Sequence, residues 1–280
     1  MEKKIGFIGQ GWIGRNYADD FERRGFGVVR YSLEEPYAQN KEKIAECDIV
    51  FIAVPTPTTP KGFDGSIVQS VLALIGEEKT AVIKSTILPG TTKELQKQYP
   101  HINLLFSPEF LSEKTAAQDA ANPFANIVGV PARDDRYERA ATRVHRVLPK
   151  ASFTLTCDSD EAEIIKYAHN ISGYTQIITF NLLYDFARSM GHDWSNIGKA
   201  IAADPFMSGY YANPVHKSGR GAGGNCFIKD FAAFTNIYEE SVLNDEKGVR
   251  VLRSLESKNK ELLTKSKKNP DILKNVYGEE

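Results

Sequence analysis

Short apolar segments alternate with amphipathic segments over the first 155 or so residues of the chain. The apolar segments have the length of buried strands, and the amphipathic segments repeat their apolar positions at helical spacing. This alternation predicts an α/β fold with a doubly wound parallel sheet. The predicted strands are Lys4–Ile8, Val28–Tyr31, Ile49–Val54, Thr80–Lys84, Asn103–Phe106 and Ala125–Val130. The predicted helices are Trp12–Arg23, Val68–Ile75, Thr91–Gln98 and Tyr137–Val147.

From Asp158 the pattern changes to long helical segments without intervening strands. Apolar residues recur at helical spacing from Ile164 to Phe186, and the pattern breaks near Gly191. A helix of this length carries more apolar surface than one small domain needs, which predicts a homodimer formed through it. We therefore expect two domains, residues 1–156 with the parallel sheet and an all-helical domain at residues 157–280.

The composition is that of a globular protein without a strong overall charge. The chain has 280 residues, of which 41% are hydrophobic, and 35 basic side chains face 36 acidic ones for a net charge of -1. No overall field draws it to nucleic acid or to an anionic membrane. No apolar run is long enough to span a membrane, and a strand beginning at about Lys3 leaves no room for a signal peptide. We expect a cytoplasmic protein.

Three cysteines stand at spacings that match neither a zinc site nor a disulfide framework, so reduced thiols and no metal are expected. Cys47 opens an apolar run and is expected to pack in a strand, whereas Cys157 is expected in a polar turn. Cys226 follows the glycine-rich loop Gly219–Gly224 after one residue, Asn225, and stands four residues before Asp230. Such a loop brings backbone amides and the Cys226 sulfur against a bulky polar ligand, although a flexible linker is the alternative.

The segment Gly9–Gly14 reads G-x-G-x-x-G, follows the first predicted strand and opens the first helix. Its glycines permit a tight turn, close approach to a pyrophosphate and helix–strand packing, which predicts a Rossmann-type dinucleotide site. Ser32 stands where the ribose-binding acid is expected. Arg30 with Ser32 would tolerate a 2′-phosphate, but Glu34 favours the free hydroxyl of NAD, so NAD is predicted and NADP stays open. The predicted cofactor residues here are Gly9, Gly11, Trp12, Ile13, Gly14 and Ser32.

Two further loops follow the third and fourth predicted strands. Val54–Thr59 is a rigid proline-containing turn, and Lys84–Thr92 leads to a hydroxyl-rich helix start. In open α/β sheets, ligands bind outside the carboxyl ends of the strands. A shared ligand cleft is therefore predicted. The alternative is that these residues only end the strands and form turns. The residues expected to contact the cofactor in these loops are Pro55, Thr56, Pro57 and Thr86.

Six segments, in this order along the chain, together resemble the UDP-glucose/GDP-mannose dehydrogenases. They are Gly9–Gly14, Val54–Pro57, Ser85–Thr92, Ser107–Leu111, Lys166–Asn170 and Gly219–Asp230. The similarity covers essentially the whole chain, as the first two domains of that family. Its members oxidise the C6 alcohol of a nucleotide-sugar to a carboxylate by two NAD-dependent hydride transfers. The resemblance implies a UDP-glucose 6-dehydrogenase-like oxidoreductase of nucleotide-sugar metabolism, with a place in polysaccharide biosynthesis.

The resemblance also implies roles for individual residues. Cys226 matches the nucleophile that attacks the aldehyde to give a thiohemiacetal, which is oxidised to a thioester and hydrolysed. Lys166 and Asn170 match the pair that surrounds the reacting oxygen, and their spacing places them on one helix face. Asp230 and Thr86 match residues that hold the catalytic water.

Further site residues follow from the same segments. Glu109 matches a glutamate implicated in thioester hydrolysis, a step that needs a base, and Glu113 matches one near the nicotinamide. Substrate contacts are implied at Phe110, Leu111, Tyr211, Asn213 and Gly223.

The chain departs from the family at several points. Full-length members carry a third, Rossmann-like domain that holds much of the nucleotide, so a short form is expected here. Phe206 in the loop Asp204–Pro214 stands where a sugar-contacting arginine is expected, and extra residues at Val215–Ser218 precede the glycine loop.

Two other functions stay open. A two-electron dehydrogenase of the β-hydroxyacid or 6-phosphogluconate type also pairs a Rossmann domain with long helices, but its chemistry needs no thioester. A protein that binds NAD(H) or a nucleotide-sugar without turnover is the other alternative. The role of Cys226 separates the first of these from the thioester route.

Overall fold

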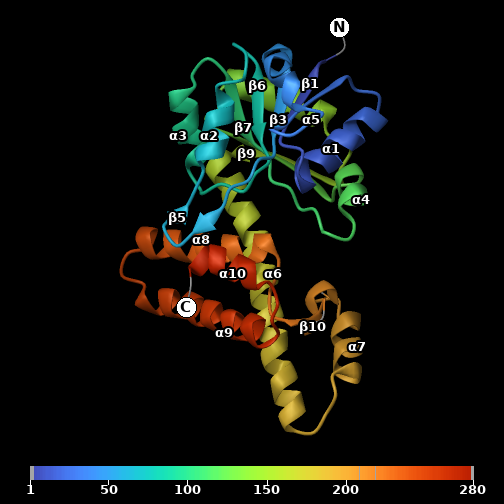
Figure 1. Ribbon diagram of the computed structural model, residues 1–280, viewed down its shortest axis with the longest axis vertical. Helices are drawn as coiled ribbons and strands as arrows, with labels where there is room; N and C mark the ends of the chain where they lie inside the picture. The colour runs from blue at the N-terminus through green and yellow to red at the C-terminus, as the bar shows by residue number, and fades with distance from the viewer. Residues whose placement is uncertain (1–2, 208, 218, 279–280) are drawn as a thin grey trace. The chain divides into compact units, whose positions relative to one another are not determined.

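The computed structural model describes residues 3–207, 209–217 and 219–278. Ser208, in the predicted substrate loop, and Ser218, before the glycine loop, lie outside the described residues. By packing, the chain forms two compact units (Figure 1). Unit 1 comprises Met1–Thr56 and Asp64–Lys166, and unit 2 comprises Pro57–Phe63 and Tyr167–Glu280. This is a division by packing, and the domain boundary expected at residues 156 and 157 stays a prediction.

Unit 1 is built on a sheet of seven strands among the described residues, in the order β2-β1-β3-β6-β7-β8-β9. The strands are β1 (Ile5–Ile8), β2 (Val28–Tyr31), β3 (Ile49–Ile52), β6 (Thr80–Ile83), β7 (Asn103–Phe106), β8 (Ala125–Val130) and β9 (Phe153–Asp158). The six predicted strands are confirmed, and the first five of them pair in parallel. β9 is an addition that the sequence did not predict.

Helices cover both faces of this sheet (Figure 1). They are α1 (Trp12–Arg23), the 3-10 helix η1 (Ala38–Glu46), α2 (Ser66–Leu72), α3 (Thr91–Gln98), α4 (Ala116–Ala121) and α5 (Asp135–Val147). Buried residues of α1, α4 and α5 pack on one face, and α2 and α3 lie on the other. The four predicted helices and the doubly wound architecture are confirmed.

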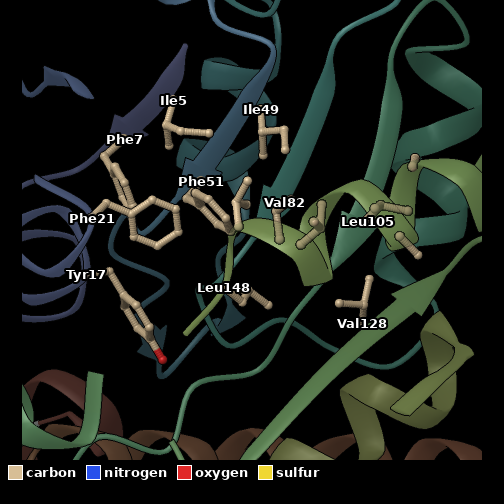
Figure 2. Packing of buried hydrophobic residues seen from close by; sticks show 14 of the residues in the cluster. Ile5, Phe7, Tyr17, Phe21, Ile49, Phe51, Val82, Leu105, Val128 and Leu148 are labelled. Atoms are coloured by element: carbon tan, nitrogen blue, oxygen red, sulfur yellow. The ribbon is translucent and has the colours of Figure 1, made fainter. Parts of the chain in front are cut away.

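Three aromatic side chains hold α1 against the sheet (Figure 2). Phe7 of β1 stacks on Phe51 of β3 with ring centroids 5.1 Å apart. The ring of Phe21 from α1 meets Phe7 at 5.2 Å and Phe51 at 5.3 Å, in edge-on geometry. All three are buried, since Phe7 and Phe51 point to the face of the sheet on which Phe21 of α1 packs. This packing holds the last turn of α1 against β1 and β3.

The orientation of β8 differs from the prediction of a parallel sheet. β8 pairs antiparallel with β7 and parallel with β9. The β7–β8 connection holds only the six-residue α4, which rises about 9 Å and does not return the chain along a whole strand. The 13-residue α5 rises about 20 Å and provides that return between β8 and β9. The sheet is therefore mixed.

The prediction that Cys157 lies in a polar turn is wrong. Cys157 is a buried residue of β9, whose sequence Phe-Thr-Leu-Thr-Cys-Asp is rich in polar residues. β9 forms the edge of the sheet. Its first two positions are exposed and the next two are of intermediate burial. An edge strand buries little apolar surface, so the hydrophobic pattern that marks the central strands is weak here.

Unit 2 contains the long helix and the glycine loop. Its elements are most of α6 (Ser159–Ser189), α7 (Ser195–Ala203), the 3-10 helix η2 (Gly209–Tyr211), β10 (Val215–His216), β11 (Gly219–Arg220), α8 (Asn225–Ser241), α9 (Glu246–Lys265) and α10 (Pro270–Tyr277). The 31-residue α6 confirms the predicted long helix. Tyr174 of α6 stacks on Phe231 of α8 at 3.8 Å in the core.

Two small hairpins make unit 2 less purely helical than expected. β10 pairs with β11, whose two residues begin the glycine loop. β4 (Thr58–Thr59) and β5 (Gly62–Phe63) form a second hairpin, which comes from the segment between β3 and α2 and packs on α8 and α10. Within the described ranges, we find no helix whose length and apolar character would let it cross a membrane.

A fully buried carboxylate, Glu163, joins α6 to the loop after β6. Its Oε1 accepts hydrogen bonds from the Thr92 amide (3.0 Å) and hydroxyl (2.5 Å), and its Oε2 accepts one from the Gly90 amide (2.6 Å). These donors lie at the start of α3, whose own N-cap residue, Gly90, offers no side chain, so Glu163 caps α3. Burial raises the pKa of Glu163 to about 7, and the charge of Asp160 adds to the rise, although the hydrogen bonds oppose it.

We expect the stability of the protein to depend on the ionisation of Glu163. Because its pKa is raised from 4.5 to about 7, the folded chain binds more protons than the unfolded chain in that window. Stability is therefore lost as pH rises from about 4.5 to 7, by up to about 3 kcal/mol. Replacing Glu163→Gln keeps an acceptor for α3 and removes this titration.

Denaturant unfolding at two pH values, about 5 and about 7.5, checks this expectation. The free energy of unfolding should fall less with pH in Glu163→Gln than in the wild-type chain. Glu161→Gln, on an exposed position of the same helix, is the matched control and should keep the wild-type slope. Equal slopes in the wild type and Glu163→Gln would contradict the assignment.

Candidate active site

The glycine turn before α1 has the geometry of a phosphate site. Gly9 has φ +90°, and a Cβ there would lie 2.2 Å from the Ala53 carbonyl oxygen. A Cβ at Gly14 would lie 1.9 Å from the Gly9 carbonyl oxygen, whereas at Gly11 nothing lies within 4 Å. Gly11 is the N-cap residue of α1 and has no side chain, so it caps none of the first amides of the helix. Helix-start amides suit a phosphate, and this turn fits the pyrophosphate of NAD.

The side chain of Arg30, near the end of β2, forms ion pairs with two carboxylates of α1. Its guanidinium forms 2.7 Å ion pairs with Asp19 and with Glu22, and its side chain is only 9% exposed. Ser32 donates its hydroxyl to the Glu34 carbonyl at 3.0 Å. Because Arg30 is already paired with two carboxylates, it is poorly placed to meet a 2′-phosphate. This arrangement favours NAD over NADP.

The two loops predicted to share a cleft are joined through Ser85. Its hydroxyl accepts a hydrogen bond from the Val54 amide at 2.9 Å and donates one to the Val54 carbonyl at 2.7 Å. Thr56 and Thr86 of these loops are buried, whereas Pro55 is exposed. Pro57 is counted with unit 2. The carboxyl ends of β3 and β6 are thus held together, as expected for one ligand site.

Lys166 and Glu109 form a buried ion pair in unit 1. The ammonium of Lys166 donates to the Glu109 carboxylate at 2.8 Å and to its carbonyl oxygen at 2.7 Å, and both side chains are 4% exposed. Glu109 also accepts from the Leu111 amide at 2.8 Å. Burial alone would raise the pKa of Glu109, but the charge and hydrogen bond of Lys166, with the Leu111 amide and Lys84, lower it overall. Glu109 is therefore a carboxylate, the form in which it can accept a proton.

A second buried lysine, Lys84, lies close to this pair and was missed in the sequence. Its ammonium donates to the Ser107 hydroxyl at 3.0 Å and lies 4.6 Å above the centroid of the Tyr17 ring. Burial lowers the pKa of Lys84 to about 7; Glu109 opposes the shift and Lys166 adds to it. Its signal in the sequence is a lysine at the end of an apolar strand, directly before the Ser85–Thr86 pair.

In unit 2, three predicted catalytic residues lie on facing helices. Cys226 is the second residue of α8 and is exposed, and Asp230 follows one turn later on the same helix. The Asn170 amide from α6 donates to the Asp230 carboxylate at 2.6 Å, and Lys229 pairs with its other oxygen at 2.5 Å. Asp230 and Asn170 are buried. The structure thus brings Asn170 to Asp230, and Asp230 to the helix face that begins with Cys226.

The remaining predicted residues differ in how far they are buried. Glu113 and Trp12 are exposed. Ile13 and Leu111 pack against the core of unit 1. The ring of Phe110 lies 5.0 Å from that of Phe124. In unit 2, Tyr211 packs edge-on against Phe227, and Asn213 accepts from the Val215 amide. Ligand contacts at these positions, and at Gly223, stay predictions.

A surface hollow of about 940 Å³ lies elsewhere in unit 1, at the amino ends of β6 and β7. Glu77, Glu78 and Asn103 line it together with one face of α5. The basic residues of that face are Arg136, Arg139, Arg143 and Arg146. This edge is opposite to the carboxyl ends of β3 and β6, so the hollow is not part of the candidate active site.

The sheet, the glycine turn and the long helix define a Rossmann-type dinucleotide-binding protein with a second, mainly helical unit. Comparison with family models is more specific. The NAD binding domain of the UDP-glucose/GDP-mannose dehydrogenase family matches residues 35–148, and the central domain of that family matches residues 160–261. The chain belongs to the UDP-glucose/GDP-mannose dehydrogenase family, which confirms the resemblance and the prediction of NAD as cofactor.

Individual relatives agree with this assignment. A UDP-glucose 6-dehydrogenase of Campylobacter jejuni is 31% identical over 76% of this chain and 55% of its own length. One of Streptococcus pneumoniae is 30% identical over 81% of this chain and 66% of its own length. The chain spans about half the length of the first curated relatives it matches. Among solved structures, a UDP-glucose dehydrogenase of Pyrobaculum islandicum has a similar fold, with a TM-score of 0.79 at 23% identity over 93% of this chain and 68% of its own.

Two alanine variants separate the folding and binding roles of the glycine turn. Gly14→Ala forces a methyl group into the Gly9 carbonyl and should destabilise the protein by about 1–3 kcal/mol. Gly11→Ala meets no neighbour, so stability should change by about 0.5 kcal/mol or less. Its methyl group stands where a pyrophosphate must approach, so NAD should bind more weakly.

Thermal unfolding with and without NAD measures both effects. The melting temperature without NAD should fall for Gly14→Ala and not for Gly11→Ala. The rise produced by NAD should shrink for Gly11→Ala. Wild-type stabilisation of Gly11→Ala by NAD would show that the dinucleotide does not lie on this turn.

Proposed function

We propose that the protein is an NAD-dependent nucleotide-sugar dehydrogenase that oxidises the C6 alcohol of a UDP-glucose-like substrate to the uronic acid. The observation that carries this proposal is the arrangement around α8. An exposed thiol, Cys226, stands at the start of a helix, one turn before a buried carboxylate, Asp230, that is bound by the Asn170 amide. This is the set that thioester formation and hydrolysis need, a nucleophile with a carboxylate and an amide donor.

The proposed reaction consists of two oxidations followed by hydrolysis of a thioester. NAD, when bound at the glycine turn, would supply the hydride acceptor, and the two oxidations together would consume two NAD molecules. The Cys226 thiolate adds to the aldehyde carbon formed first. The resulting thiohemiacetal loses a hydride from this carbon and a proton from its hydroxyl group to become a thioester. Water then adds to the thioester carbon, the carbon–sulfur bond breaks, the carboxylate product leaves and the Cys226 thiol is regenerated. Lys166 and Asn170 stabilise the oxyanions as N–H donors, and Asp230 with Thr86 holds the water.

Glu109 is proposed as the base that takes a proton from that water. Its ionisation supports this role, because the pKa of Glu109 is lowered mainly by Lys166 against the opposing effect of burial. The 2.8 Å ion pair also weakens Glu109 as a base, so proton transfer requires the pair to loosen. The glucose and uridine parts of the substrate, and a cytoplasmic location, stay predictions.

Counting NADH formed per substrate consumed tests the proposal with UDP-glucose and GDP-mannose. Two equivalents and an acid product are expected from one of these nucleotide-sugars. Cys226→Ser should abolish acid formation, because a serine hydroxyl forms neither a thiohemiacetal nor a thioester. Cys157→Ser, in β9 of unit 1, is the matched control and should keep two equivalents.

One equivalent from the wild type, unchanged by Cys226→Ser, would favour the second candidate function. A 3-hydroxyisobutyrate dehydrogenase of Mycobacterium tuberculosis matches with a TM-score of 0.71 at 16% identity, over 95% of both chains. That similarity concerns the fold alone. A two-electron dehydrogenase stays the alternative because its chemistry needs no thioester.

We also propose that the protein forms a homodimer through α6. The later part of this helix exposes large apolar side chains, the adjacent Leu182 and Leu183 and, one turn later, Phe186, which are 50%, 46% and 63% exposed. A contiguous apolar helix face is costly to leave in water, and a second copy of the same face covers it.

Light scattering coupled to gel filtration tests the dimer. The wild-type chain should have about twice the mass of one chain, and Leu183→Glu with Phe186→Glu should halve it. Leu243→Glu, on a 76% exposed residue between α8 and α9, is the matched control and should leave the mass unchanged. A monomeric wild-type chain would exclude this interface.

A further inference from the structure

The glycine loop before Cys226 is held by α9 through a buried asparagine. The Asn259 side chain accepts a hydrogen bond from the Ala222 amide at 2.7 Å and donates one to the Ala222 carbonyl at 3.0 Å. Asn259 is 2% exposed, and both of its bonds satisfy backbone groups that are buried with it. The loop is therefore an ordered segment and not a flexible linker.

The junction between α9 and α10, residues 266–269, holds the same loop from its other side. The ammonium of Lys268 donates to the Gly221 carbonyl at 2.9 Å. The Asn269 side-chain oxygen accepts from the Gly224 amide at 3.0 Å. Asn269 has φ +56°, a left-handed conformation that asparagine tolerates better than most residues. This conformation directs a short amide side chain at the loop.

The contacts also explain why particular positions of the loop are glycine. A Cβ at Gly223 would lie 2.4 Å from the Asn269 side-chain oxygen, and one at Gly219 would lie 2.8 Å from Lys268. The loop backbone can lie against the junction only without side chains at these positions. Gly224 ends the loop as the N-cap residue of α8, two residues before Cys226. The hydrogen bond from Gly224 thus reaches the backbone that carries the thiol.

α10 fixes the junction to the helix of the thiol. Ile228 and Ala232 of α8 pack with Leu263 of α9 and Val276 of α10 in one buried cluster. The match to the central domain of the family ends at residue 261. Lys268, Asn269 and α10 therefore lie beyond the family's central-domain match, although they contact or pack near a loop that lies within it.

We infer that Lys268 and Asn269 are positioning residues that set the conformation of Gly221–Gly224 and thereby the place of Cys226 at the start of α8. The catalytic importance of Cys226 rests on the proposed function, whereas the contacts that hold the loop do not. Loss of either side-chain contact should loosen the loop and the first turn of α8, and leave the rest of unit 2 in place.

The test uses substitutions that keep the backbone conformation. Asn269→Gly retains easy access to positive φ but removes the acceptor of the Gly224 amide. Asn269→Asp restores an acceptor at the same place and is the rescue variant. Lys268→Met removes the donor to Gly221, and Lys267→Met, on an exposed neighbour that also has positive φ, is the matched control.

Hydrogen exchange by mass spectrometry reads out the loop directly. In Asn269→Gly and Lys268→Met, exchange of residues 221–225 should rise about tenfold, while residues 228–241 keep wild-type exchange. Asn269→Asp and Lys267→Met should exchange like the wild type. Unchanged exchange at 221–225 in Asn269→Gly, or an equal rise in Lys267→Met, would overturn the inference.

Alkylation of Cys226 and turnover report the effect on the thiol. Fraying the first turn of α8 removes amides that favour a thiolate, so Asn269→Gly should be alkylated about threefold more slowly at neutral pH. Protection of the buried Cys47 and Cys157 shows that the fold is kept. In an active wild type, acid formation should fall about tenfold without a change in NAD affinity.

The exchange and alkylation measurements need no turnover, so they decide the inference even if the wild type oxidises no nucleotide-sugar. An inactive wild type with the expected exchange pattern would refute the proposed function and support the role of the junction. Wild-type alkylation and acid formation in Asn269→Gly would overturn that role.

Discussion

The electrostatics of unit 1 depend on the burial of one carboxylate between two lysines. Glu109 pairs with Lys166, and Lys84 lies close enough to influence the pKa of Glu109 as well. Removing charges from water is expensive, and one carboxylate cannot fully compensate two ammonium groups. The excess positive charge is reduced at Lys84, because burial lowers the pKa of its ammonium group to about 7. β6 and β7, which end directly before Lys84 and Ser107, are therefore joined by these charge interactions as well as by apolar packing.

Much of unit 1 could be predicted because its strands and helices are marked by patterns of residues that are neighbours in the sequence. The central strands are short continuous apolar runs, buried on both faces, and β1, β3, β6 and β7 were found within one or two residues. The glycine turn was also predictable, since the need for glycine at Gly9 and Gly14 comes from backbone atoms close by in the fold. Helix α6 was predictable from its length and periodicity.

The features that the sequence did not reveal depend on contacts between distant segments. Glu163 caps α3 from 71 residues away, and a glutamate in an amphipathic helix reads as a solvent-facing residue. Asn259 and Asn269 stand about 40 residues beyond the glycine loop in a polar, lysine-rich stretch that resembles a solvated helix face. The direction of β8 and the edge strand β9 likewise follow from the length of a connection and the edge of the sheet. Local patterns carry no record of such partners.

The hairpin of β4 and β5 has a consequence for how this chain reaches its native state. Its residues precede most of unit 1 in the sequence, yet they pack on α8 and α10 at the other end of the chain. During synthesis the hairpin leaves the ribosome long before α8 and α10, the helices on which it packs. It therefore has no packing partner while unit 1, whose sequence continues on both sides of it, is completed. A fragment that begins at Tyr167 would lack this piece and expose the surface it covers. The two units are compact bodies, but they are not interchangeable modules, because the polypeptide is threaded from one into the other and back.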